Sequence, residues 1–273
     1  MEAACAQGPA DSFDKQARAA WARGAHEEAI RTAGKAIAAE PNSPDGYLLR
    51  AAMYEALDNF SEAEKDMTAA LGADPDSAEI YNRRGAVYFK AGDMAKSIAD
   101  FDRTIELDPG QEPHHWQRGI AYYYAGRYAD GRRQFELHKS VNPHDVENGV
   151  WHFLCVARIE GPEAARGVMI PISGDPRVPM SQVYEMFRGK LAPEQAFEAA
   201  KVGKPDKDAL QERLFMANLY VGLYREAHGD FGAARKYITS AARDYPRGHY
   251  MWHVARVHAE RYEAGVQPAE AAR

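Results

Sequence analysis

Histidine is the first residue type to consider for chemistry, because ten histidines occur in the chain. His249 and His253 are four positions apart in a segment predicted to be helical, so they would share one helix face and could ligate a metal together. The adjacent His114 and His115 would point to different faces. No HExxH motif occurs, and no carboxylate stands at a zinc-hydrolase spacing from a histidine. We therefore expect surface or interface histidines and predict no bound metal and no cofactor.

A catalytic nucleophile is not indicated by any motif in the sequence. The GxSxG, GxGxxG and P-loop motifs are absent, and neither Cys5 nor Cys155 belongs to a known local Cys–His arrangement. The two cysteines form no CxxC pair, which argues against a thiolate zinc site or a dithiol redox centre. We expect two free thiols and a protein that is not an enzyme. A metal-dependent enzyme remains an alternative that only His249 and His253 support.

Aromatic side chains offer a different kind of chemistry, the recognition of another polypeptide. If the segment from His115 to Arg127 is helical, Trp116, Tyr123 and Tyr124 lie away from the face that carries Tyr122. Rings on a rigid surface provide a large contact area at a low cost in side-chain entropy. Whether these rings meet a partner or pack inside the protein depends on the elements that hold them.

Those elements repeat along the chain with a period of 34 residues, which separates Pro41, Pro75, Pro109 and Pro143. Other features keep the same period. They are turn residues at Gly24, Asp58, Gly92 and Gly126, small residues at Ala17, Ala51, Gly85 and Gly119 and at Ala29, Ala63, Ser97 and Gly131, and aromatic residues at Tyr54, Tyr88 and Tyr122. Each unit therefore reads as two helices joined at the turn residue, with close backbone packing at the small residues and a helix end before each proline.

This pattern resembles the tetratricopeptide repeat (TPR). The resemblance implies an all-α fold, a right-handed superhelix of about seven helical hairpins followed by a C-terminal capping helix. We expect disordered tails at 1–9 and 265–273, four regular repeats at 10–143, degenerate hairpins with a Pro/Gly loop at 144–206, and a final repeat with the capping helix at 207–264. In such an array, the first helix of each hairpin lines a concave groove.

Groove positions are those on the first helices that do not pack against neighbouring repeats. Helical spacing assigns to the groove Asp14, Arg18, Trp21, Leu48, Glu55, Asn82, Arg83, Phe89, Lys90, Trp116, Gln117, Ile120, Tyr123 and Tyr124. Two interpretations of the aromatic residues in the fourth repeat stay open: they recognise a partner in an open groove, or they pack against the degenerate hairpins. A full basic clamp for an acidic C-terminal tail is not expected, since only Arg18 and Arg83 could serve in it.

A narrower likeness lies in the layout of the repeats, with regular units, a degenerate middle and a restored last unit. The segments HWQRGIAYYYAGR (115–127) and LYVGLYREAHGDFGAA (219–234) are similar to repeats of the periplasmic NlpI-type TPR lipoproteins. The resemblance implies an envelope adaptor that brings a protease to its protein substrate, usually as a homodimer.

The charge balance and hydropathy pattern restrict the partner and the compartment. The net charge is −6, with 34 basic and 40 acidic residues and no basic run, which argues against a nucleic-acid partner. No apolar stretch is long enough to span a membrane. We expect a cytoplasmic protein from the sequence as given, or a periplasmic or envelope-anchored one if an export signal has been trimmed before Cys5. The predicted function is a non-catalytic scaffold for a protein or peptide, with a self-associating homodimeric scaffold as the alternative.

Overall fold

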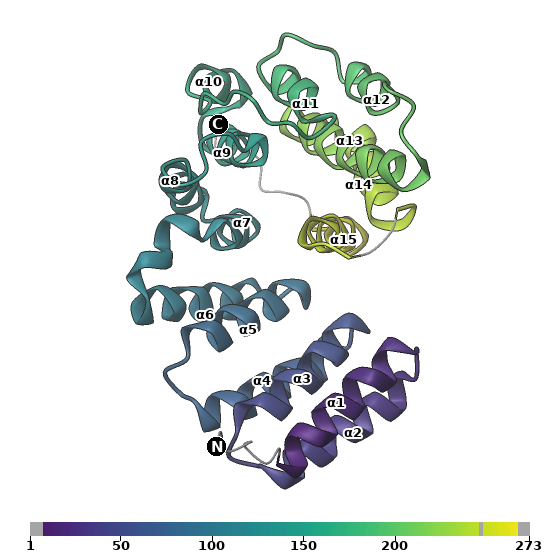
Figure 1. The fold of residues 1–273 in the computed structure, drawn as a ribbon. Helices are drawn as coiled ribbons and strands as arrows, with labels where there is room; N and C mark the ends of the chain where they lie inside the picture. The colour runs from purple at the N-terminus through teal and green to yellow at the C-terminus, as the bar shows by residue number, and fades with distance from the viewer. Residues whose placement is uncertain (1–7, 246–247, 267–273) are drawn as a thin grey trace, which may run out of the picture. The chain divides into compact units, whose positions relative to one another are not determined.

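All regular elements in the described part of the chain, residues 8–245 and 248–266 of a computed structural model, are helices (Figure 1). They form two compact units, Met1–Pro109 and Gly110–Arg273, which we call unit 1 and unit 2. Seven helical pairs and one further helix are described, which confirms the predicted all-α architecture of hairpins with a last capping helix.

Unit 1 contains three antiparallel helical hairpins. Their helices are α1 (Pro9–Ala22), α2 (His26–Ala39), α3 (Pro44–Ala56), α4 (Phe60–Ala73), α5 (Ala78–Lys90) and α6 (Met94–Leu107). Within each hairpin, the turn residue has the positive φ that the tight reversal needs, as at Gly24 (φ 81°) and Gly92 (φ 85°). The non-glycine residue Asp58 takes the same region with φ 56°.

The starts of α3, α4 and α6 are fixed by side chains that satisfy free backbone amides. Asn59 accepts a hydrogen bond from the amide of Glu62, and Asp93 accepts one from the amide of Lys96. Pro44 stands in the first turn of α3, where its missing amide hydrogen costs nothing. The local sequence therefore sets the helix boundaries before any tertiary contact is made.

Small residues let the two helices of a hairpin approach closely. A Cβ atom at Gly85 would lie 2.7 Å from Phe101, and one at Gly119 would lie 2.7 Å from Phe135. Phe101 and Phe135 are fully buried against these glycines, so the ring fills the space that a side chain at the glycine would occupy. The recurrence of the small residue at the predicted period thus has a steric cause.

Unit 2 contains the fourth regular repeat and everything that follows it. Its helices are the 3-10 helix η1 (Pro109–His114), which begins at the boundary, and α7 (Trp116–Tyr124), α8 (Tyr128–His138), α9 (Val146–Glu160), α10 (Pro162–Gly167), α11 (Met180–Phe187), α12 (Glu194–Ala200), α13 (Lys207–Ala227), α14 (Phe231–Arg243) and α15 (Tyr250–Glu263). Helix α9 is buried almost throughout its length and contacts α7, α8, α10, α11 and α13, so it is the central helix of this unit.

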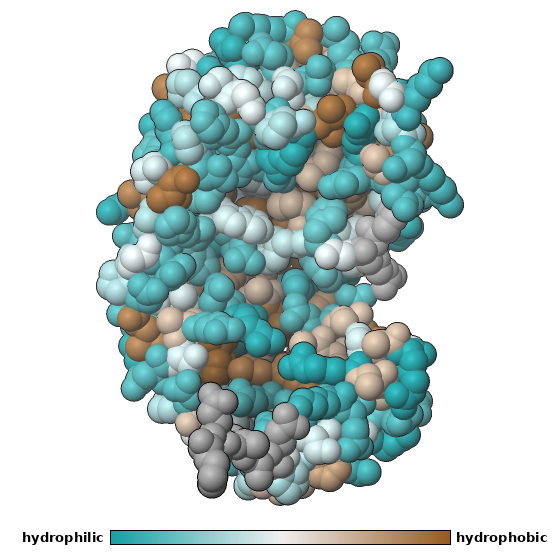
Figure 2. Space-filling model, in the orientation of Figure 1, coloured by the Kyte–Doolittle hydropathy of each residue, from teal (hydrophilic) through white to brown (hydrophobic). Residues whose placement is uncertain are grey.

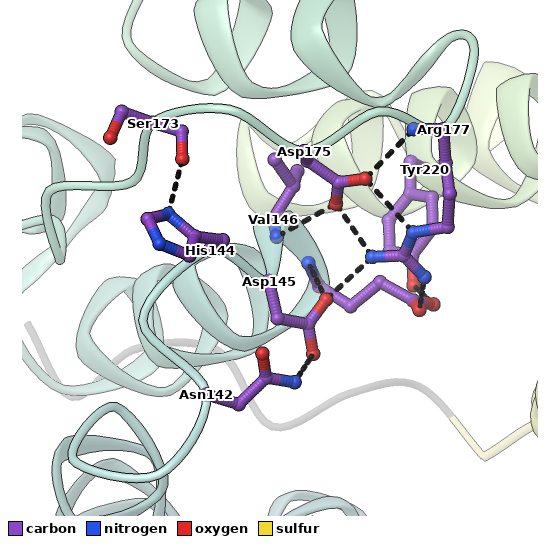
Figure 3. A network of polar contacts seen from close by, with 9 residues as sticks. Asn142, His144, Asp145, Val146, Ser173, Asp175, Arg177 and Tyr220 are labelled. Carbon is purple, nitrogen blue, oxygen red and sulfur yellow. Dashed lines mark hydrogen bonds and ion pairs between the residues drawn. The ribbon is translucent and has the colours of Figure 1, made fainter.

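The Pro/Gly-rich segment 168–179 is fixed to α9 by a cluster of charges (Figure 3). Arg177 donates hydrogen bonds to Asp145 at 2.6 Å and to Asp175 at 2.6 Å, and it also pairs with Glu147. Asp175 in turn accepts a hydrogen bond from the amide of Val146 at 3.1 Å. The segment is a loop, as its composition predicts, and this loop is anchored at one end by Arg177.

Residues 144–206, which are predicted to form degenerate hairpins with a Pro/Gly loop, contain α9, α10, α11 and α12, with the loop between α10 and α11. The fourth regular repeat belongs to the same compact unit as these helices. Apart from Gly8 and Pro9, and from Gly265 and Val266, the two predicted tails lie outside the described residues, as does Cys5.

Candidate polypeptide-binding groove

A groove in unit 1 is formed by the first helices of its hairpins, α1, α3 and α5. Two adjoining pockets of about 340 Å³ each make up this groove, and they share Arg18, Leu49 and Ala52. The first pocket is mainly apolar and is completed by Trp21, Met53 and Ala56, whereas the second is completed by Asp14, Asp45, Leu48 and Arg83. Five of the predicted groove residues, Asp14, Arg18, Trp21, Leu48 and Arg83, therefore line one continuous site.

The charges of this groove are partly uncompensated. Arg18 is exposed where the two pockets meet, and its guanidinium makes no hydrogen bond or ion pair with any residue in the described ranges. Asp14 lies one turn before Arg18, and burial raises the pKa of its carboxyl group, against the opposing effect of Arg18. The Oδ1 atom of Asp14 is buried and accepts no hydrogen bond from the described residues. An arginine without a hydrogen bond or ion pair to the described residues and an unsatisfied acceptor thus face the same groove.

Other predicted groove residues hold α3 and α5 together. Lys90 pairs with Glu55, and both side chains are largely buried. Arg83 donates a hydrogen bond to the Leu48 carbonyl oxygen at 3.5 Å. Asn82 is half-buried, and its Oδ1 atom has no hydrogen-bond partner among the described residues. Of these residues, Leu48 and Arg83 line one of the two pockets, whereas Glu55, Asn82 and Lys90 line neither of them.

Phe89 was assigned to the groove by helical spacing, but its side chain is fully buried in the structure. It therefore offers no surface to a partner.

The aromatic residues of the fourth repeat are also internal. Tyr123 and Tyr124 are buried, and Ile120 on the same helix is buried with them. Tyr123 packs edge-on against Trp151 of α9, with ring centroids 5.4 Å apart. Of the two interpretations that the sequence leaves open, the structure places these rings in packing against the later helices of unit 2.

Helix α15 supplies the other half of this packing. The Trp116 ring lies edge-on to Tyr250 at 5.0 Å between centroids, and the Tyr124 hydroxyl is 2.9 Å from His258 Nδ1. Arg261 donates a hydrogen bond to the Tyr124 carbonyl oxygen at 2.9 Å. Trp116 and Gln117 are only half-buried, so of the groove residues predicted on α7 these two keep accessible surface.

A buried ionic network that the sequence analysis missed joins α7, α9, α13 and α15. Glu226 accepts hydrogen bonds from Arg158, His258 and Tyr262, and Arg158 also donates to the Tyr123 hydroxyl at 3.0 Å. These residues lie far apart in the sequence and share no motif, so no local pattern pointed to them.

The sequence analysis also missed a set of ion pairs that has a sequence pattern, in which an arginine is followed 16 residues later by an acidic residue. Arg50 pairs with Asp66 and Arg84 with Asp100, each through two hydrogen bonds of 2.7–2.8 Å. In the fourth repeat, Arg118 donates to the neutral Gln134 at 3.2 Å. The pairs recur with the 34-residue period, so the repeat alignment contains them.

His249 and His253, the pair considered as metal ligands, each lie against an aromatic side chain. His249 is the residue before α15, its ring lies edge-on to Phe215 at 4.7 Å, and burial lowers its pKa. His253 lies beside Trp252, with ring centroids 5.0 Å apart. In residues 8–245 and 248–266, no group of three or more His, Cys, Asp or Glu side chains is arranged to hold a metal ion. Cys155 is a buried free thiol whose pKa is raised by burial.

The family model described as "Tetratricopeptide repeat" matches residues 15–66 and 54–112. This part of the chain is therefore made of tetratricopeptide repeats. The matched residues cover the hairpins of unit 1, which contain the groove, and extend into η1. No curated protein matches the sequence.

Solved structures with the same fold include TPR proteins. A TPR protein from Parabacteroides merdae is 16% identical with a TM-score of 0.58, covering 92% of this chain and 97% of that one. A double mutant of MamA is 18% identical with a TM-score of 0.54, covering 59% of this chain and 92% of that one. YrrB, described as a TPR protein with an unusual peptide-binding site, is 16% identical with a TM-score of 0.50, covering 73% of this chain and 89% of that one. These identities establish the shared fold alone.

None of the described helices combines the length and the apolar character that crossing a bilayer requires.

Proposed function

We propose that this protein is a non-catalytic scaffold that binds a segment of another polypeptide in the unit 1 groove. The observation that carries the proposal is the pair of adjoining pockets on α1, α3 and α5, which share the unpaired cation of Arg18. Figure 2 shows apolar surface, in brown, flanked by hydrophilic surface on the part of the molecule that unit 1 occupies.

The two pockets differ in the chemistry that they would recognise. The pocket beside Trp21 and Met53 suits an apolar side chain, because its walls are a ring, a thioether and methyl groups. Arg18 at the junction suits a carboxylate, which would form a charge-assisted hydrogen bond there. We therefore expect a partner segment in which an acidic residue stands close to an apolar one.

A peptide ligand is consistent with the use of this fold elsewhere. The YrrB structure, which is that of a different protein, is described as having a peptide-binding site. One fold serves many functions, so peptide binding by this chain is supported by its own groove and not by the fold.

The test uses a substitution that fills the groove without disturbing the core. Ala52 is exposed and lines both pockets, so Ala52→Arg would place a long side chain across their junction. Ala38 is exposed on α2, which contributes no residue to either pocket, and Ala38→Arg is the matched control. Peptides would be selected from a random library with the full chain and measured against each variant by fluorescence anisotropy.

We expect Ala52→Arg to weaken the selected peptides at least tenfold and Ala38→Arg to leave their affinity unchanged. Arg18→Glu should weaken the acidic peptides most, because it puts a like charge in the site of the carboxylate. Equal affinity of the wild type and a folded Ala52→Arg variant would reject the groove as the binding site.

A further inference from the structure

Unit 2 contains a pocket of its own, separate from the groove of unit 1. Its volume is about 200 Å³, and it is surrounded mainly by apolar side chains from α7, α8, α9 and α15. These apolar residues are Trp116, Ile120, Phe135, Trp151 and Met251. For comparison, an apolar cavity of about 150 Å³ engineered in another protein binds benzene. The pocket therefore has room for a six-membered ring with one small substituent.

Two lining residues on α9, Asn148 and Trp151, carry polar side-chain atoms without a hydrogen-bond partner among the described residues. Their exposed fractions are 2% and 1%, yet Asn148 Oδ1 and Trp151 Nε1 make no hydrogen bond to any described residue. The two residues are three positions apart, so they lie on the same face of the helix. A residue with an unused acceptor and a residue with an unused donor thus share one face of α9 at a buried site, where unsatisfied polar groups are costly.

The third feature of the pocket is an acidic edge formed by Asp145 and Glu147. Both carboxylates are already engaged, since Arg177 pairs with each of them and Tyr220 donates a hydrogen bond to Glu147 (Figure 3). Counting Asp175, three carboxylates share the single positive charge of Arg177. The local field is therefore negative and opposes an anionic ligand.

We propose that this pocket binds a neutral phenolic group, a six-membered ring that carries one hydroxyl. A hydroxyl both donates and accepts, so it can donate to Asn148 Oδ1 and accept from Trp151 Nε1 at the same time. The ring would lie among the Trp116, Ile120 and Met251 side chains. A plain hydrocarbon ring would fill the space but leave both polar atoms unsatisfied, and a benzoate would meet the acidic edge.

The test is a titration of the full chain followed by the indole N–H resonances of its four tryptophans. Phenol, benzene and benzoate are the probes. We expect phenol to shift the resonances of Trp151 and Trp116 saturably, benzene to bind about tenfold more weakly because it makes neither hydrogen bond, and benzoate not to bind. The Trp21 resonance, in unit 1, should not move.

A pair of variants separates the hydrogen bond from the packing. Trp151→Phe removes the indole donor while keeping a ring, and it should weaken phenol binding to an affinity between those of the wild type for phenol and for benzene, because the hydrogen bond to Asn148 Oδ1 remains. Trp252→Phe is the matched control, because Trp252 is a buried tryptophan of the same unit that does not line the pocket. We expect this control to bind phenol as the wild type does.

The phenolic group could belong to a small molecule or to a tyrosine of another polypeptide, and a second pair of probes distinguishes these sources. If N-acetyl-tyrosinamide shifts the same resonances and N-acetyl-phenylalaninamide does not, the pocket accepts a tyrosine side chain. If free phenol binds and neither amide does, the ligand is a small molecule. No saturable shift of Trp151 by phenol, or equal phenol affinity of a folded Trp151→Phe variant, would overturn the proposal.

Discussion

Glu226 Oε2 lies 2.7 Å from His258 Nε2 in unit 2, and the two side chains are 1% and 4% exposed. Burial alone would raise the pKa of Glu226, but His258 and Arg158 outweigh burial and lower it to about 2. Glu226 of α13 pairs with Arg158 of α9 and His258 of α15 through buried side chains, so its ionisation state couples to the packing of unit 2.

As the pH is lowered, unit 2 should therefore unfold at a higher pH than it would if burial of apolar surface were its only source of stability. The pKa of Glu226 is about 2 in the folded protein against 4.5 as its ordinary value. The stabilisation is fully present above pH 4.5 and is lost as the pH falls towards 2, and it amounts to roughly 3 kcal/mol. Urea unfolding measured between pH 7 and pH 2 would show this loss.

Glu226→Gln is the variant for that measurement. It should be less stable at pH 7, because Arg158 keeps its charge in a buried site, and its stability should depend less on pH below 4.5. Glu163→Gln, at an exposed position, is the control and should behave as the wild type. An unchanged acid dependence in a folded Glu226→Gln variant would contradict the assignment.

Glycine positions within helices should respond in opposite directions to alanine. Gly85→Ala is expected to destabilise unit 1 by about 1–3 kcal/mol, because the new Cβ would lie 2.7 Å from the buried Phe101 ring. Gly72→Ala in α4 meets no atom within 4 Å and should stabilise by up to about 1 kcal/mol through helix propensity. Thermal unfolding of both variants tests this, and a gain in stability from Gly85→Ala would refute the close-packing argument.

The recurrent arginine–aspartate pairs should contribute to the stability of unit 1. Asp100→Asn removes the negative charge and one of the two acceptors that the largely buried Arg84 guanidinium uses, and we expect a cost of about 1–3 kcal/mol. Asp76→Asn is the control, because Asp76 is exposed and lies 3.5 Å from Arg103. Urea unfolding curves that coincide for the two variants would show that the pair is energetically neutral.

Arg177 should determine how accessible the loop 168–179 is to proteases. Arg177→Gln removes the cation shared by three carboxylates, so the loop should be cleaved faster than in the wild type. Arg188→Gln removes an exposed arginine paired with Glu185 and serves as control. Limited proteolysis followed by mass spectrometry would locate the cuts, and equal cleavage rates would argue against the anchor.

The helix boundaries could be predicted because they depend on nearby residues. Asp93 caps α6 and Gly92 makes the turn before it, and both belong to the segment that they shape. Part of the lining of the unit 1 groove could also be predicted, since helical spacing on neighbouring repeats places Arg18, Trp21 and Leu48 there.

The burial of the aromatic residues of α7 could not be predicted in the same way. Tyr124 is covered by His258, 134 positions later in the chain, and nothing in the 34-residue period specifies where α15 will pack. Helical spacing also treats all residues off the packing face as groove residues, and this is why it misassigned Phe89.

The position of α15 has a practical consequence for experiments with shortened chains. This helix packs on Trp116 and Tyr124 as a bound peptide would. A fragment that stops before residue 248 would uncover these rings and leave an adhesive aromatic surface. Such a fragment would retain proteins through the rings that the truncation exposes. Searches for the natural partner should therefore keep the C-terminal helix in place.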